Sequence, residues 1–155
     1  MNIKLADHEI RLGNEVIATF KRFQQKGFKA HEAGGILLAQ IRSKEIFILK
    51  ASVPDKKDQS SRFRFLRQIQ PAQNIIIKAF KESNHRTVYI GEWHTHPETS
   101  PSPSGQDIRM IKEQFSKGAL NESFILLIIV GLRDLYVAKY DGELISTVVK
   151  LIDDN

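Results

Sequence analysis

The sequence contains no cysteine, and this absence excludes several kinds of chemistry at once. A chain without thiols cannot form a disulfide, bind zinc through cysteine or use a thiol nucleophile. The lack of cysteine is also in keeping with a cytoplasmic protein, which is the location we expect. A length of 155 residues is enough to close a proper core, so we expect a single domain over residues 1–155.

Long apolar segments are lacking as well. The longest apolar run, Phe124 to Val130, has seven residues, whereas a membrane-spanning helix needs roughly 20. The first residues, MNIKLADHEIR, do not contain the apolar stretch of a secretory signal peptide. We therefore expect no contact with a membrane, and we interpret the apolar run as a buried strand.

The charge is moderately basic, with a formal net charge of +5. The basic residues are dispersed except in one denser patch, which consists of Lys56, Lys57, Arg62, Arg64 and Arg67. Because phenylalanines are interleaved with these residues, the patch could stack bases over a cationic groove. A solvated loop followed by an edge strand explains the same residues and is the interpretation that we favour. Nucleic acid is therefore not an expected partner.

Apolar periodicity and turn residues predict a mixed sheet flanked by helices, which is α+β, or α/β in the loose sense. Helices are expected over residues 14–25, 71–82 and 107–115, with Asn14 as the N-cap of the first. A polar loop is expected over residues 53–61, followed by an extended segment over 62–66. Strands are expected over residues 9–12, 33–41, 45–51, 87–91, 123–130, 135–140 and 143–150.

One segment, residues 91–107, carries the side chains best suited to bind a metal ion and reads GEWHTHPETSPSPSGQD. Residues two apart in a strand point the same way, so His94 and His96 project from one face. Two such imidazoles can share one ion at roughly 2.0–2.1 Å per Zn–N bond. Asp107, in the first turn of the next helix, can supply a third ligand. The fourth tetrahedral position is then left for water, as in catalytic zinc sites, so we expect one Zn²⁺ per chain.

Two residues near this segment allow more than one interpretation. Ser104 stands three residues before Asp107, as in a capping box, and its hydroxyl could both cap the helix and face a substrate carbonyl. Glu92 shares the face of the two histidines. A ligand so close along the strand would crowd them, so we place Glu92 behind the metal ligands or facing solvent.

Glu32 is the candidate general base. It opens an apolar strand, and Gly34 and Gly35 directly after it allow a ligand or another backbone to approach closely. A carboxylate at the end of a buried strand is seldom a plain surface charge. An ion pair with a nearby arginine is the alternative explanation for it.

These residues together resemble the JAB/MPN+ (JAMM) metalloprotease domain over residues from about 10 to 140. The resemblance rests on Glu32 with GGILL, then His94-Thr-His96-Pro97, then Ser104-x-x-Asp107. It implies a cytidine-deaminase-like fold in which the two histidines and the aspartate bind zinc. It also implies that the glutamate activates the zinc-bound water and that the serine helps to hold the oxyanion.

Two other catalytic classes fit the residues less well. A deaminase of this fold is excluded because its zinc needs cysteines. A hydrolase triad of Ser104, His94 and Asp107 is disfavoured because no nucleophile elbow surrounds the serine.

The string GEWHTHPE followed by PSPS resembles a bacterial branch found beside E1- and E2-like conjugating enzymes. Its best-known members are the deconjugating proteases of CBASS anti-phage operons. The resemblance implies a conjugated protein substrate with an extended C-terminal tail, namely a cGAS-like nucleotidyltransferase. A ubiquitin-like or sulfur-carrier-like protein is the alternative substrate, and a non-catalytic MPN-type scaffold is a further alternative, although scaffold members lose the ligands.

The tail needs a narrow groove beside the histidines. An extended chain could add there alongside an exposed strand through backbone hydrogen bonds. We expect residues 62–66 and 98–103 to form its walls, with contacts from Arg62, Phe63, Arg64, Phe65 and Glu98.

Overall fold

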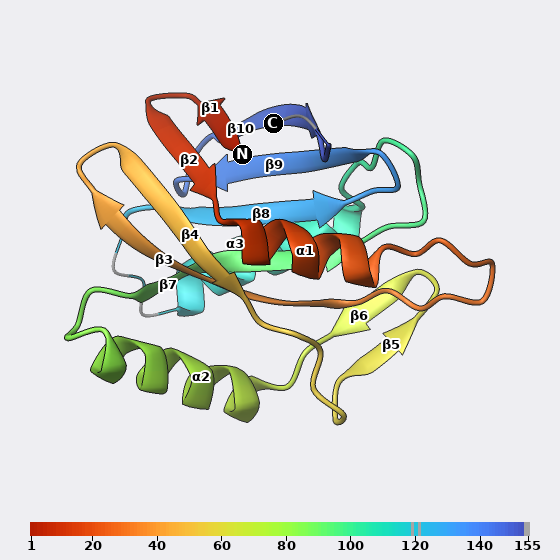
Figure 1. The fold of residues 1–155 in the computed structure, drawn as a ribbon, viewed down its shortest axis with the longest axis horizontal. Helices are drawn as coiled ribbons and strands as arrows, with labels where there is room; N and C mark the ends of the chain where they lie inside the picture. Colours follow the sequence, from red (N-terminus) through yellow and green to blue (C-terminus); the bar gives the residue numbers. More distant parts are fainter. Residues whose placement is uncertain (119, 121, 154–155) are drawn as a thin grey trace.

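In the computed structural model, which describes residues 1–118, 120 and 122–153, the fold is built on an eight-stranded mixed sheet (Figure 1). The β2–β4 and β7–β8 pairs are parallel and the other neighbours are antiparallel. In spatial order the strands are β1 (Asn2–Leu5), β2 (His8–Leu12), β4 (Glu45–Ala51), β3 (Gly34–Arg42), β7 (Val88–Thr95), β8 (Ile125–Val130), β9 (Asp134–Tyr140) and β10 (Ile145–Leu151).

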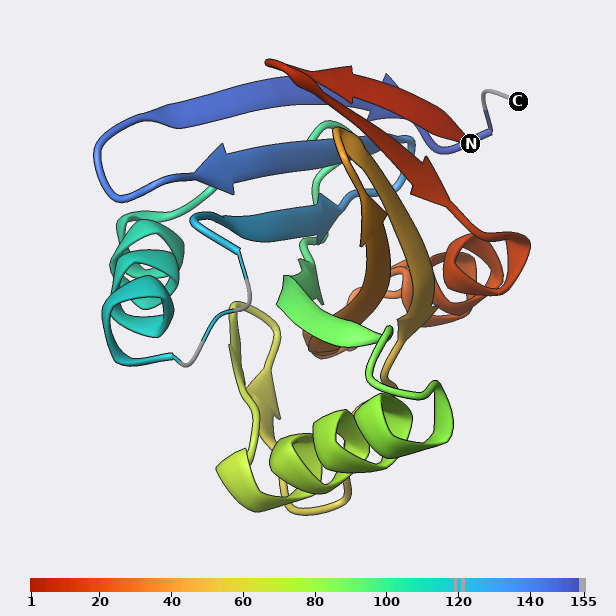
Figure 2. The same ribbon diagram turned by 90° about the vertical axis from the view of Figure 1, so that its left-hand side faces the viewer.

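The three helices of the described residues cover the two faces of this sheet (Figure 2). The helix α1 (Asn14–Phe23) packs on one face, and α2 (Ile69–Glu82) and α3 (Gly105–Lys117) pack on the other. The buried strand β8 shows the division, because its side chains alternate between the two cores. Leu126 and Ile128 belong to the core with α1, whereas Ile125 and Leu127 contact the core under α3.

The strand β7 lies at the centre of the sheet and ends at the histidine motif. It pairs with β3 on one side, where Gly34 lies opposite His94, and with β8 on the other, where His94 lies opposite Ile129. Paired on both sides, the carboxyl end of β7 is a rigid support for functional side chains.

The mixed fold class is confirmed, and the predicted strands and helices are present with shifted ends. Predictions for two segments are wrong, and one strand was missed. Asn14 is not the N-cap of α1, because Gly13 occupies that position without any side-chain cap, and the helix ends at Phe23. The polar loop over residues 53–61 contains a strand, β5 (Gln59–Ser61), which pairs with β6 (Arg64–Leu66) in a separate hairpin. The strand β1 was not expected from the sequence.

The described residues contain no helix that combines the length and the apolar character needed to cross a bilayer.

Because β7 and β8 approach closely at Gly91, we expect a side chain at this position to destabilise the protein. A Cβ atom at this position would lie 2.0 Å from the Leu126 carbonyl oxygen, which is backbone and cannot move aside. We expect Gly91→Ala to lower the free energy of unfolding by roughly 1–3 kcal/mol or more. Chemical denaturation measures this change.

Gly27→Ala is the matched control, because a Cβ there would meet nothing within 4 Å. It should leave the unfolding free energy within about 1 kcal/mol of the wild-type value, or raise it slightly. Equal stability of the two variants would contradict the close β7–β8 packing.

Candidate metal centre and catalytic site

The end of β7 delivers two buried histidines to one face of the sheet. His94 and His96 are both buried, and their ring centroids lie 5.0 Å apart. Thr95, between them, points to the opposite side, where it is fully buried. The strand alternation expected from the sequence is therefore present.

Asp107 is brought to the histidines by the capping box at the start of α3, which the sequence predicted and the structure confirms. The Asp107 amide donates to Ser104 Oγ at 3.1 Å, and the Ser104 amide donates to Asp107 Oδ2 at 2.8 Å. These reciprocal bonds fix the carboxylate at the helix end that faces β7. Ser104 itself is exposed, so its hydroxyl proton remains accessible to a bound molecule.

The three side chains converge at distances that suit a zinc ion. Asp107 Oδ1 lies 3.2 Å from His94 Nε2, and Asp107 Oδ2 lies 3.2 Å from His96 Nε2. Ligand atoms bound tetrahedrally at zinc distances lie roughly 3.3 Å apart. His94 Nε2 is buried and has no hydrogen-bond partner among the described residues. A buried nitrogen that lies near a carboxylate and a second imidazole but makes no hydrogen bond of good geometry fits a metal site.

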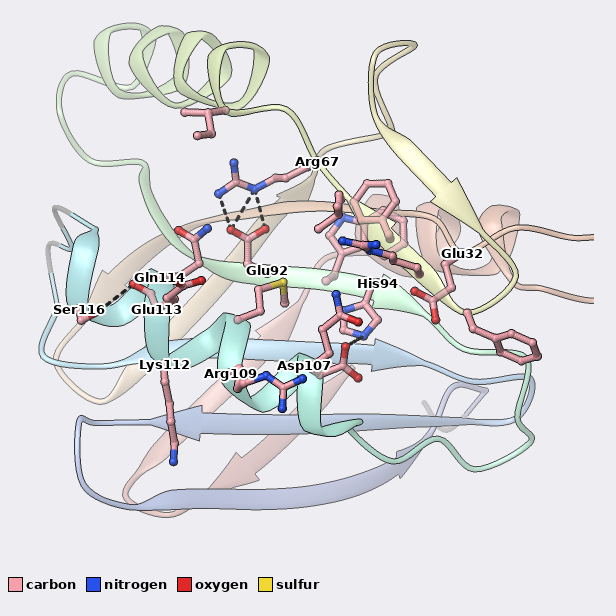
Figure 3. A pocket seen from close by; sticks show the side chains of 18 residues that line it. Glu32, Arg67, Glu92, His94, Asp107, Arg109, Lys112, Glu113, Gln114 and Ser116 are labelled. Atoms are coloured by element: carbon pink, nitrogen blue, oxygen red, sulfur yellow. Dashed lines mark hydrogen bonds and ion pairs between the residues drawn. The ribbon is translucent and has the colours of Figure 1, made fainter.

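Glu32 lies beside this group. Its Oε1 is 3.6 Å from His96 Nε2, and Figure 3 shows the carboxylate pointing toward His94 and Asp107. Burial raises the pKa of Glu32 to about 7, with the nearby His96 opposing the rise. A carboxyl group with a pKa near neutrality can both take up and release a proton at physiological pH.

The pKa values of Asp107 and His96 are each shifted toward the charged form of the side chain. Burial alone would raise the pKa of Asp107, but the His94 and His96 imidazoles outweigh that effect and lower it. Burial opposes the charged form of His96, but Asp107 outweighs it and raises the pKa of His96. Asp107 is thus held as an anion, the form that binds a metal ion.

A polar network that the sequence did not reveal holds the Glu32 segment against β7. The Ala33 amide donates to Thr95 Oγ1 at 2.9 Å, and the Thr95 amide donates to the Ala33 carbonyl at 2.8 Å. The Thr95 hydroxyl donates to Gln25 Oε1 at 3.0 Å, and Gln25 Nε2 donates to the Arg62 carbonyl at 3.0 Å. Nothing in the sequence marks Gln25, a buried amide just after a helix, as part of the site.

A groove of about 820 Å³ opens from this group. Glu32, His94 and Asp107 lie at the site end, the β5–β6 hairpin forms one wall, and α3 forms the other. Three of the residues expected to contact a substrate tail line it, namely Phe63, Arg64 and Phe65.

The other two expected groove residues are placed differently, since Arg62 and Glu98 are not among the described residues that line this groove. The Arg62 guanidinium donates to the Phe28 carbonyl and lies over the rings of Phe28 and Phe63. Glu98 is half exposed, with Oε1 3.6 Å from His96 Nδ1. Glu98 thus lies on the side of the His96 ring opposite Nε2, the atom that faces Asp107.

Arg67 and Glu92 also differ from expectation. Of the two placements expected for Glu92, the one that faces solvent is wrong, because Glu92 is buried and bound by the Arg67 guanidinium at 2.6–3.0 Å. Arg67 therefore does not belong to a solvated basic patch, although its position in the sequence suggested one.

Comparison with known proteins agrees with this geometry. Residues 15–141 match the family model described as prokaryotic homologs of the JAB domain. The chain is 30% identical to a protein of Escherichia coli named "CD-NTase/cGAS isopeptidase", over 86% of this chain and 83% of that one. Proteins with the same name from Vibrio cholerae and Pseudomonas aeruginosa are 29% and 31% identical, over 88% and 86% of this chain and 85% and 84% of theirs.

A solved structure shares the fold. The solution structure of a protein from Desulfitobacterium hafniense superposes with a TM-score of 0.54 at 18% identity, covering 92% of this chain and 90% of that one. The family match spans most of the sequence and includes every residue of the candidate site. The chain therefore belongs to the prokaryotic homologues of the JAB domain.

Proposed function

We propose that this protein is a zinc-dependent isopeptidase that releases a cGAS-like nucleotidyltransferase from its conjugates in CBASS anti-phage defence. The observation that carries the proposal is the convergence of His94, His96 and Asp107 beside Glu32 at the end of a groove. The names of the relatives support the substrate class, because three of them are CD-NTase/cGAS isopeptidases.

His94, His96 and Asp107 would hold the zinc ion through the atoms that converge between them. When bound, zinc supplies a strong nucleophile at neutral pH by lowering the pKa of a coordinated water to about 7, and it polarises a carbonyl oxygen. The positive charge of the ion would also favour the ionised form of Glu32.

Glu32 would act twice in the hydrolysis. It takes a proton from water as the water oxygen attacks the carbonyl carbon of the isopeptide bond. The Ser104 hydroxyl, which is accessible beside Asp107, donates a hydrogen bond to the oxygen that becomes negative. The carbon–nitrogen bond then breaks, and Glu32 gives its proton to the departing lysine amine. A pKa near 7 suits a group that must accept and then donate.

The groove suits an extended C-terminal tail more than a folded surface. Its hairpin wall ends in the short strand β6 and presents Phe63 and Phe65, while α3 closes the other side. A tail could lie along β6 through backbone hydrogen bonds, with its last carbonyl at the metal centre. E1- and E2-like enzymes would make the conjugates that this protein cleaves.

The alternatives have weaker support. Removal of a ubiquitin-like or sulfur-carrier-like protein would use the same site, but the relatives' names favour the nucleotidyltransferase. A non-catalytic scaffold would not need three converging ligands with a carboxyl group of raised pKa beside them.

The metal is tested by zinc analysis of purified protein. We expect about one zinc per chain, and its loss in His94→Ala and Asp107→Ala, since each removes one of three protein ligands. His85→Ala is the control, because this histidine is exposed and precedes the opposite end of β7. Stoichiometric zinc in both ligand variants would place the metal elsewhere.

The general base and the pathway are tested together by Glu32→Gln. This variant should fold and keep its zinc while cleavage falls by roughly 10²-fold or more, because an amide cannot accept the proton. In cells that express the conjugating enzymes and the nucleotidyltransferase, conjugates should accumulate with Glu32→Gln and disappear with wild-type protein, as read on a gel. Equal conjugate levels in the two cultures would contradict the proposed substrate. Near-normal turnover of a cleavable conjugate by Glu32→Gln would contradict the assignment of Glu32 as the general base.

The two roles of Ser104 are separable. Ser104→Ala should lower stability by ~1 kcal/mol through the lost cap, and the rate by roughly 10²–10³ through the lost oxyanion donor. Ser104→Gly is the matched variant, because glycine costs an N-cap only a few tenths of a kcal/mol. Both variants should lose the same activity while differing in melting temperature. Full activity in Ser104→Gly would leave only the capping role.

A further inference from the structure

A buried network of three side chains joins the floor of the groove to its hairpin wall. Arg67, in the segment between β6 and α2, donates from Nε to both oxygens of Glu92 at 3.0 and 2.9 Å, and from a terminal nitrogen at 2.6 Å. The Tyr89 hydroxyl donates to the same carboxylate at 2.7 Å. Figure 3 shows the Arg67 guanidinium next to the Glu92 carboxylate, with dashed lines marking the contacts between them.

The charges of Arg67 and Glu92 are paired with each other in the protein interior. The side chains of Arg67 and Glu92 are only 17% and 6% exposed. Burial opposes the charged form of Arg67, but the Glu92 carboxylate outweighs it and raises the pKa of Arg67. Such a planar, bidentate contact restricts both direction and distance, unlike a mobile surface pair.

The β5–β6 hairpin depends on contacts of this kind for its position. In the described part of the chain, β5 and β6 pair with each other and not with the main sheet (Figure 1). An isolated two-stranded hairpin is only marginally stable in water. At the site end, the Glu32 amide donates to the Ser61 carbonyl at 2.6 Å, and the Phe65 ring packs on Gly34. The far end of the hairpin leads directly into Arg67.

We propose that Arg67 and Glu92 are positioning residues that hold the β5–β6 hairpin in the arrangement that accepts an extended substrate tail. Glu92 is suited to this because it stands two residues before His94 on the same face of β7. One rigid strand therefore fixes both the metal ligands and the wall along which the tail lies. The inference rests on the proposed isopeptidase function.

The kinetic signature differs from that of a catalytic residue. If the hairpin is loosened, only a fraction of molecules can accept the tail, and KM rises by the inverse of that fraction. We expect Arg67→Met to raise KM for the conjugate roughly tenfold or more, with kcat within about twofold of wild type and the zinc content unchanged. Amide hydrogens of residues 59–66 should exchange faster in this variant.

A double variant separates positioning from mere stability. Arg67→Met alone leaves Glu92 buried without its cation and can weaken the fold. Arg67→Met with Glu92→Met removes both charges and replaces them with apolar groups, which often restores stability. We expect the melting temperature to return toward the wild-type value while KM stays high. Recovery of both quantities would overturn the proposal, because packing alone would then suffice.

Lys57→Met is the control for loss of a positive charge, since Lys57 is exposed in the loop before β5. It should leave KM and the exchange of residues 59–66 unchanged. Wild-type KM in Arg67→Met would contradict the proposal. If wild-type protein cleaves no conjugate, the proposed function fails, but the exchange measurement still tests whether Arg67 holds the hairpin.

Discussion

The site depends on the fixed position of β7 between β3 and β8. Gly91 allows the β8 backbone to approach so closely that a side chain would not fit. The strand therefore cannot shift without breaking the centre of the sheet. The end of this strand carries His94 and His96, the Thr95 contact with the Glu32 segment, and Glu92, which binds Arg67 next to the hairpin wall. Asp107 reaches the same place from the start of α3.

Three of the carboxyl groups that line the groove, Glu32, Asp107 and Glu92, have different surroundings. Glu32 is buried, and the nearby His96 offsets the effect of burial only in part. The pKa of Glu32 therefore rises to about 7, and the carboxyl group can exchange protons near neutral pH. Asp107 has two imidazoles beside it and stays ionised, as a metal ligand must. The Glu92 carboxylate is bound by Arg67 and Tyr89, and these contacts occupy it in a structural role. This difference between the pKa values of Glu32 and Asp107 supports the proposal that Glu32 is the general base.

The local sequence was enough to predict that His94, His96 and Asp107 lie together, because they stand at short spacings in the chain. A spacing of two residues along a strand places His94 and His96 on one face. The Ser104–Asp107 capping box brings the aspartate to them. The roles of Gln25 and Arg67 were not predictable, because their partners lie 70 and 25 residues away in the chain. No periodicity records such contacts. Asn14 misled the helix prediction because a good capping residue next to Gly13 lies one position inside the helix.

The most direct test of this account is a crystal structure of zinc-loaded Glu32→Gln protein with a peptide that carries the nucleotidyltransferase tail joined to a lysine side chain. The account predicts zinc bound by His94, His96 and Asp107, and the tail extended along β6 with the isopeptide carbonyl near Ser104 and residue 32. Zinc bound elsewhere, or a tail lying outside the groove between the hairpin and α3, would contradict it.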